Sequence, residues 1–193
     1  MFKLWRAIPV AALAILWLVW FVLHSRGSTP TPSVPNFTLS DMPVGLTQGV
    51  NTIQDDAAYA AANPGLTVEK LHGSGQVLFS EVRFSSAATA GLVVVDSKVS
   101  ICTTPAKAKA TYGRLASFLD MLLKPRAIPH VGVDSRGWAS TDTSESVKSF
   151  SDYVAFWRGK YVVEMYIIDA GRDLDVLQFA KMYNLLDSRL QRG

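Results

Sequence analysis

Cysteine is almost absent from the sequence, and this absence excludes several kinds of site. The 193 residues contain one cysteine, Cys102. A single thiol cannot form an intramolecular disulfide bond, and it cannot supply a zinc site built from several cysteines. Because Cys102 follows the apolar run GLVVVDSKVSI (91–101), we expect it to be a buried and unreactive thiol.

The sequence also lacks an excess of positive charge in the part expected to fold. The formal net charge of the chain is +3, but Lys3, Arg6 and Arg26 flank an apolar segment at the N-terminus. Residues 27–193 then hold equal numbers of basic and acidic side chains. A nucleic-acid-binding protein is expected to carry a basic patch or stripe. No basic run follows Arg26, so we do not expect nucleic acid as a partner.

One long apolar run is present, at residues 4–23 (LWRAIPVAALAILWLVWFVL). A helix of that length rises about 30 Å, which is the thickness of the hydrocarbon core of a bilayer. Lys3, Arg6 and the terminal amine outnumber Arg26, so the positive-inside rule places the N-terminus in the cytoplasm. The alternative is a signal peptide cleaved at Ser25-Arg26-Gly27, but the apolar run is longer than such peptides normally have. We favour an uncleaved, single-pass anchor in the cell membrane.

The chain therefore divides into three predicted parts. Residues 1–26 form a cytoplasmic stub and transmembrane anchor, and residues 27–36 form a linker. Three prolines in STPTPSVPN (28–36) favour an extended spacer. Residues 37–193 form one extracytoplasmic domain, which is long enough to bury a core of its own.

Apolar periodicity in residues 37–193 predicts an α+β domain. Helical spacing and capping residues predict three helices, at residues 51–62 with Thr52 as cap, from Thr104 onward, and at 174–190 with Asp173 as cap. Alternating and β-branched runs predict strands at 76–85 and 90–102, and a β-hairpin at 149–169. Together these elements indicate an antiparallel sheet of about five strands with helices packed on its faces.

The stretch IPHVGVDSRGWAS (128–140) holds the residue types of a hydrolase. His130 and Asp134 could serve with Ser135 or Ser140. However, the sequence has no G-x-S-x-G nucleophile elbow, and neighbouring residues of an extended segment point in alternating directions. The residue types alone therefore do not establish a catalytic triad.

We favour a structural interpretation of the same stretch. Gly132 permits a tight bend, Asp134 and Arg136 could pair across the loop, and Trp138 starts the next strand and fills the core. His72, in HGSGQ (72–76), follows a similar logic, because that segment lacks the lysine and spacing of a phosphate-binding loop. His130, Asp134, Arg136 and His72 together remain a candidate functional surface. We assign no catalytic, cofactor-binding or metal-binding residue and expect no cofactor.

Five segments carry a resemblance to a loose family of bacterial membrane-anchored extracytoplasmic α+β domains. They are LSDMPVGL (39–46), VEKLHGSGQVLFSEVRF (68–84), IPHVGVDSRGW (128–138), YVAFWRGKYVVEMYI (153–167) and LQFAKMYNLLDSRL (177–190). Where that family often has Gly-Asp-Glu, this chain has Gly132-Val133-Asp134. The resemblance implies a domain without an established enzymatic role. By general shape the predicted domain is also similar to PsbP-like sandwiches, which bind partners rather than catalyse reactions.

Three functions follow as hypotheses. The first is a noncatalytic domain that binds or senses a protein or envelope ligand. The second is an envelope hydrolase that uses His130 or His72. The third is a carrier of a small apolar molecule, in a cavity lined by aromatic side chains such as Phe150, Tyr153, Phe156, Trp157 and Tyr166. The membrane is the partner of residues 4–23, and the sequence does not define an oligomeric state.

Overall fold

The structure is a computed structural model that describes residues 33–86, 93–142, 149–170 and 176–192. The chain divides into two units, Met1–Ser33 and Val34–Gly193, and all elements below belong to the second. The predicted anchor at residues 4–23 and the predicted cap Asp173 lie outside the described residues. Of the helices that are described, none has both the length and the apolar character needed to cross a membrane.

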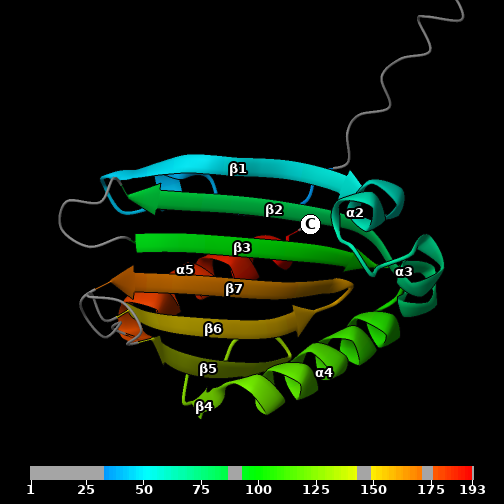
Figure 1. Cartoon of the computed structure of the whole chain (residues 1–193). Coiled ribbons are helices and arrows are strands. Elements are labelled where there is room, and N and C mark those ends of the chain that lie inside the picture. Colours follow the sequence, from blue (N-terminus) through cyan, green and yellow to red (C-terminus); the bar gives the residue numbers. More distant parts are fainter. Residues whose placement is uncertain (1–32, 87–92, 143–148, 171–175, 193) are drawn as a thin grey trace, which may run out of the picture. The chain divides into compact units, whose positions relative to one another are not determined.

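A single antiparallel sheet organises the domain, in the order β1-β2-β3-β7-β6-β5-β4 (Figure 1). The predicted α+β class is thus confirmed, but the sheet has seven strands rather than about five. The strands are β1 (Leu46–Asp55), β2 (Gln76–Ser86), β3 (Val93–Cys102), β4 (Lys124–Arg126), β5 (Asp134–Asp142), β6 (Ser149–Arg158) and β7 (Tyr161–Ala170). The predicted hairpin at 149–169 forms β6 and β7, which turn at Gly159 with a φ of 53°.

The predicted helix at 51–62 is wrong in its first part. Residues 51–55 belong to strand β1, and only Asp56–Ala62 are helical, as α2. Asp55, rather than Thr52, caps this helix by accepting a 2.8 Å hydrogen bond from the backbone N–H of Ala58. β1 is an edge strand whose side chains are mostly exposed. Its sequence therefore lacks the apolar alternation that would have marked it as a strand.

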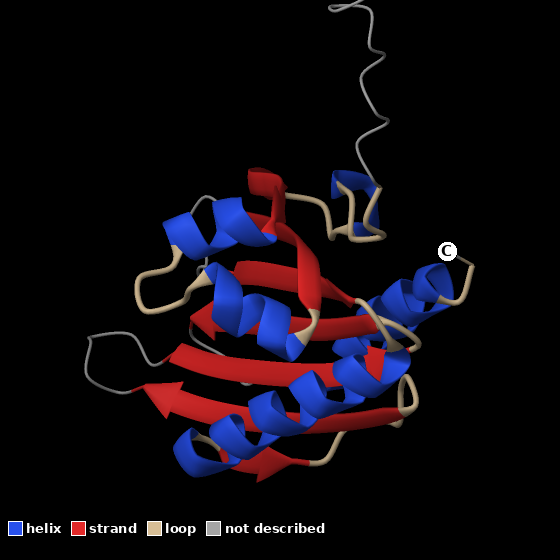
Figure 2. Ribbon diagram, turned by 90° about the vertical axis from the view of Figure 1, so that its right-hand side faces the viewer, coloured by secondary structure: helices blue, strands red, loops and turns tan. Residues whose placement is uncertain are grey.

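The helices lie on both faces of the sheet. They are the short 3-10 helix η1 (Leu39–Asp41), α2 (Asp56–Ala62), α3 (Val68–Ser74), α4 (Pro105–Leu122) and α5 (Val176–Leu190). Figures 1 and 2 show α2, α3 and α4 on one face and α5 on the other. α4 begins as expected, because Thr104 accepts a hydrogen bond from the N–H of Lys107 and proline occupies the first turn.

Two hydrophobic cores hold these layers together. The larger core lies between the sheet and α5 and includes Phe84, Val95 and Tyr183, all fully buried. The smaller core lies between the sheet and α4 and includes Trp138 and Cys102. Cys102 is 1% exposed, and burial raises the pKa of its thiol, as expected for a buried, unreactive cysteine. Trp138 fills the core from β5, which confirms the structural interpretation of that residue.

The N-terminal end of the domain is attached to α5. Val34 and Phe37 are buried in the larger core, so the packed chain starts earlier than the prolines of the linker suggested. Arg189 of α5 donates hydrogen bonds of 2.7 and 2.6 Å to the carboxylate of Asp41 and one of 2.8 Å to the carbonyl of Asn36. The Arg189 guanidinium is the main reason that the pKa of Asp41 lies below its usual value.

Candidate functional site

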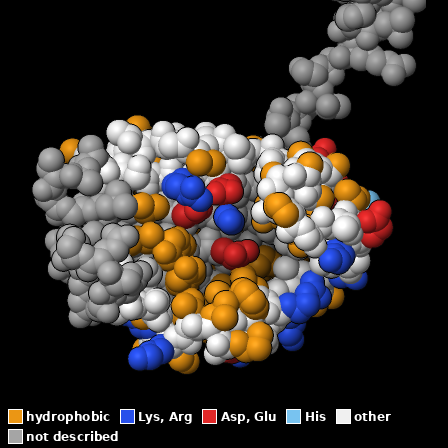
Figure 3. Space-filling model, viewed as in Figure 1, with side chains coloured by type: hydrophobic (Ala, Val, Ile, Leu, Met, Phe, Trp, Pro, Cys, Tyr) orange, Lys and Arg blue, Asp and Glu red, His pale blue; other side chains and the backbone are white. Residues whose placement is uncertain are grey.

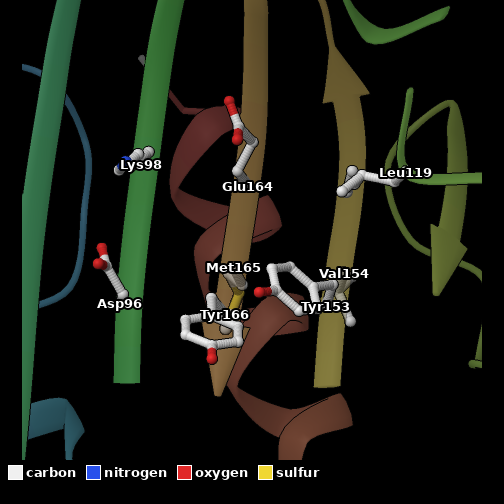
Figure 4. A pocket seen from close by; sticks show the side chains of 9 residues that line it. Asp96, Lys98, Leu119, Tyr153, Val154, Glu164, Met165 and Tyr166 are labelled. Atoms are coloured by element: carbon white, nitrogen blue, oxygen red, sulfur yellow. The ribbon is translucent and has the colours of Figure 1, made fainter. Parts of the chain in front are cut away.

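A cleft of about 250 Å³ opens over the middle of the sheet, on the face that also carries α2, α3 and α4. Side chains of β3, β7 and β6 form its floor, and Leu119 of α4 forms part of one wall. Figure 3 shows acidic and basic side chains gathered in a hollow at the centre of this face, bordered by hydrophobic side chains. Figure 4 shows the floor at close range.

The register of three strands builds the first row of the floor. Glu81 of β2 lies opposite Lys98 of β3, and Lys98 lies opposite Glu164 of β7. Directly opposed residues of an antiparallel pair point to the same face of the sheet, so the three charges form a line across it. Neither Lys98 nor Glu164 forms a hydrogen bond or salt bridge with another described residue.

A second row runs parallel to the first. Arg83 of β2 lies opposite Asp96, and Asp96 lies opposite Tyr166. Arg83 donates hydrogen bonds of 2.9 and 2.6 Å to one carboxylate oxygen of Asp96, Oδ2, and one of 3.1 Å to Glu81. The other oxygen of Asp96, Oδ1, is buried and has no hydrogen-bond partner. Since the side chain of Asp96 is only 9% exposed, bulk water reaches it poorly.

Glu164 is an acidic group of the floor that forms no hydrogen bond or salt bridge with another described residue. Burial raises the pKa of its carboxyl group, although the charge of Lys98 acts in the opposite direction. The side chain of Glu164 is only partly buried, so water still reaches it and the cost of removing its charge from water is incomplete. The domain therefore holds two acceptors, the Glu164 carboxylate and the buried Asp96 Oδ1, that form no hydrogen bond with its described residues.

Aromatic side chains border these acceptors. The rings of Tyr153 and Tyr166 are tilted by 31° with centroids 4.3 Å apart, and both line the cleft (Figure 4). Burial and the hydroxyl of Tyr166 raise the pKa of Tyr153, so it stays neutral at physiological pH. Tyr59 of α2 stacks on Phe79 of β2 with ring centroids 3.8 Å apart. The charges of the first row also influence the pKa of the Tyr59 hydroxyl group.

The cleft offers carboxylate oxygens, tyrosine hydroxyls and aromatic rings on one surface. In the ranges that the structure describes, no group of three or more His, Cys, Asp or Glu side chains is placed to hold a metal ion.

The predicted candidate surface is divided between different parts of the domain. Asp134 and Arg136 do lie together, in a groove of about 410 Å³ against α4 that Tyr112 and Trp157 also line. The prediction that these two residues form an ion pair with each other is wrong. Both residues belong to β5 rather than to a loop, and Arg136 instead pairs with Asp120 of α4 at 2.6 Å. Burial and the charge of Asp134 raise the pKa of Tyr112 to about 12.

The two histidines of the candidate surface lie in different parts of the domain. His72 lies at the end of α3, just before β2, and contacts Asp56. His130 is exposed in the segment before β5. Since β3, β7 and β6 separate β2 from β5, the two strands are roughly 19 Å apart.

The aromatic residues expected to line one apolar cavity do not do so. Tyr153 and Tyr166 line the cleft, whereas Trp157 lines the groove against α4. Phe156 is completely buried in the core on the α5 side. Alternate residues of β6 point to opposite faces of the sheet, which explains why Phe156 faces away from Tyr153 and Trp157.

Sequence reasoning missed the charged rows. The available signal was weak but present: Glu164 is the one charged residue in the apolar run YVVEMYII (161–168). A lone acidic residue in a strand covered on both faces needs a partner, a ligand or water. Its neighbours Lys98 and Asp96 could be assigned to the same face only once the register was known.

Comparison with known proteins identifies no family. No protein-family model matches the sequence, and no curated protein matches it. Among solved structures, the crystal structure of the extracellular domain of PknH from Mycobacterium tuberculosis is similar, with a TM-score of 0.47 and 11% sequence identity. The similarity covers 77% of this chain and 86% of that chain. At that TM-score the similarity amounts to a partial likeness in fold, and the extracellular location is a property of the neighbour.

Proposed function

We propose that residues 34–193 form a noncatalytic ligand-binding or sensing domain that an N-terminal anchor at residues 4–23 holds outside the cytoplasm. The apolar run and the charges around it support the anchor and its orientation. The proline-rich segment that follows would separate the domain from the membrane surface. On this proposal the domain meets its ligand in the cell envelope.

The observation that carries the binding proposal is the unsatisfied oxygen of Asp96. Its Oδ1 atom is buried without a partner at the floor of an open cleft. Most buried polar atoms in folded proteins are hydrogen-bonded, and an exception in a concave site supports the presence of a ligand or ordered water there. Glu164, in the same cleft, strengthens the case because it also lacks a partner.

Native mass spectrometry tests this proposal. The full-length protein would be released from its own membranes in mild detergent, together with two variants. We expect a small noncovalent adduct on the wild type and on Asp134→Asn, which alters the groove against α4. We expect Tyr166→Ala, which removes part of the cleft wall, to lose that adduct while unfolding cooperatively. An adduct that survives Tyr166→Ala would place the ligand elsewhere and contradict the proposal.

A further inference from the structure

We infer that the cleft takes a small organic cation, whose ammonium group meets the Glu164 carboxylate and whose body packs on Tyr153 and Tyr166. This inference rests on the proposed binding function and names the chemical class of the ligand. It follows from the charge, the hydrogen-bonding capacity, the aromatic lining and the size of the cleft.

The charges of the floor leave one negative charge uncompensated. Glu81, Asp96 and Glu164 are acidic, whereas only Arg83 and Lys98 are basic. Arg83 is committed to Asp96 and Glu81 through its hydrogen bonds. A ligand with one positive charge would balance the two rows, whereas an anion would add to the excess.

The hydrogen-bonding groups of the floor also favour a donor. The Glu164 carboxylate and Asp96 Oδ1 can only accept hydrogen bonds when ionised. An ammonium group offers three donors and no acceptor, so it matches the Glu164 carboxylate, which lines the cleft. A bare metal ion fits less well, because the described residues supply no cluster of three acidic, histidine or cysteine side chains at metal-binding positions.

The tyrosine pair supports an organic rather than an inorganic cation. Aromatic rings attract cations within about 6 Å of the ring centroid, and they also pack against an apolar body. The cleft of about 250 Å³ exceeds the cavity of about 150 Å³ that accepts benzene. A one-ring amine therefore has room, and 2-phenylethylamine is a suitable probe.

Lys98 is the internal competitor for this position. It lies opposite Glu164 in register, but the two side chains form no salt bridge. If an external ammonium group binds Glu164, the like charge of Lys98 opposes it. Removing Lys98 should then strengthen amine binding, whereas removing the charge of Glu164 should weaken it.

Isothermal titration calorimetry of the full-length protein in detergent tests the inference with three probes of similar shape. They are 2-phenylethylamine, the neutral 2-phenylethanol and the anionic phenylacetate. We expect the amine to bind at least tenfold more tightly than the other two. We expect Glu164→Gln to weaken amine binding at least tenfold, Lys98→Met to strengthen it several-fold, and the control Asp134→Asn to leave it unchanged.

Each other result overturns the inference. Equal or tighter binding of phenylacetate or 2-phenylethanol would show that positive charge is not what the cleft selects, and so would amine binding that is insensitive to Glu164→Gln. If none of the three probes bound, the cation would be rejected. In every one of these cases, a native adduct that disappears in Tyr166→Ala would leave the proposed binding function standing, so the two failures are distinguishable.

Discussion

At the scale of single residues, Glu164 and Asp96 show that a strand can hold acidic groups its own domain does not satisfy. The residues that precede and follow Glu164 along β7 are buried and apolar. Val162, Val163 and Met165 are 0–1% exposed. Stability alone would favour a neutral side chain at such a position. An acid at this position is what the proposed binding role requires.

This argument predicts that Glu164→Gln stabilises the unliganded protein at neutral pH. The folded-state pKa of Glu164 is raised by burial, so the folded protein binds the proton more tightly than the unfolded chain does. The ionised group therefore destabilises the fold above its unfolded pKa of about 4.3. We expect a gain of about 1 kcal/mol at pH 7, less than the full cost of an unsatisfied buried group, because the side chain of Glu164 is only partly buried.

Urea unfolding of the wild type and of Glu164→Gln, measured from pH 7 downward, checks this prediction. The difference in unfolding free energy should disappear once the pH falls below the unfolded pKa, because both side chains are then neutral. Asp134→Asn, at an exposed position, should change stability by less than about 0.5 kcal/mol. A Glu164→Gln variant that is less stable than the wild type at pH 7 would contradict the account.

At the scale of secondary-structure elements, α5 and the N-terminal segment close one side of the domain through an ion pair. The carboxylate of Asp41 is 10% exposed and accepts two hydrogen bonds from Arg189. It also accepts hydrogen bonds from the N–H and hydroxyl of Thr38, which hold η1 in place. The contact joins residues that are 148 positions apart in the chain.

Asp41→Asn should destabilise the fold by about 1–3 kcal/mol at neutral pH, because it removes charge-assisted hydrogen bonds from a largely buried pair. The folded-state pKa of Asp41 is lowered, so its contribution is present above the unfolded pKa of about 3.9. That contribution is lost as the pH falls through the folded pKa, and the variant and wild type should then converge.

Thermal unfolding as a function of pH measures this effect. The control is Arg136→Gln, which breaks an ion pair whose partners are 51% and 39% exposed. Exposed pairs contribute about 0–1 kcal/mol, so the control should stay close to the wild type. An Asp41→Asn variant as stable as that control at pH 7 would show that the N-terminal segment does not secure α5.

The same scale explains which elements the sequence could and could not predict. The hairpin of β6 and β7 and the start of α4 carry strong apolar periodicity or capping residues, and both form as predicted. β1 and β4 lie at the two edges of the sheet, where few side chains are buried. Edge strands can therefore be polar, and in β1 this polarity made an alanine-rich helix the better match.

At the scale of the whole molecule, the cleft could not be predicted because it depends on long-range register. The segments that contribute Asp96, Lys98 and Glu164 each have the pattern of an ordinary strand with a few polar positions. Only the order β3-β7-β6 brings them together with Tyr153. In contrast, the residues of the polar stretch around His130 are adjacent in the chain. In the fold Asp134 and Arg136 line the groove against α4, whereas His130 is exposed before β5.

The central claim is that this cleft opens to the outside of the cell, and the accessibility of a cysteine on its wall tests that claim most directly. Cys102 is 1% exposed, so the wild-type chain supplies a nearly silent background. Leu119→Cys would place a thiol at the cleft, and Phe118→Cys would place one at a 53% exposed position beside it. A membrane-impermeant maleimide should modify both variants in intact cells, and modification of either one only after lysis would contradict the account.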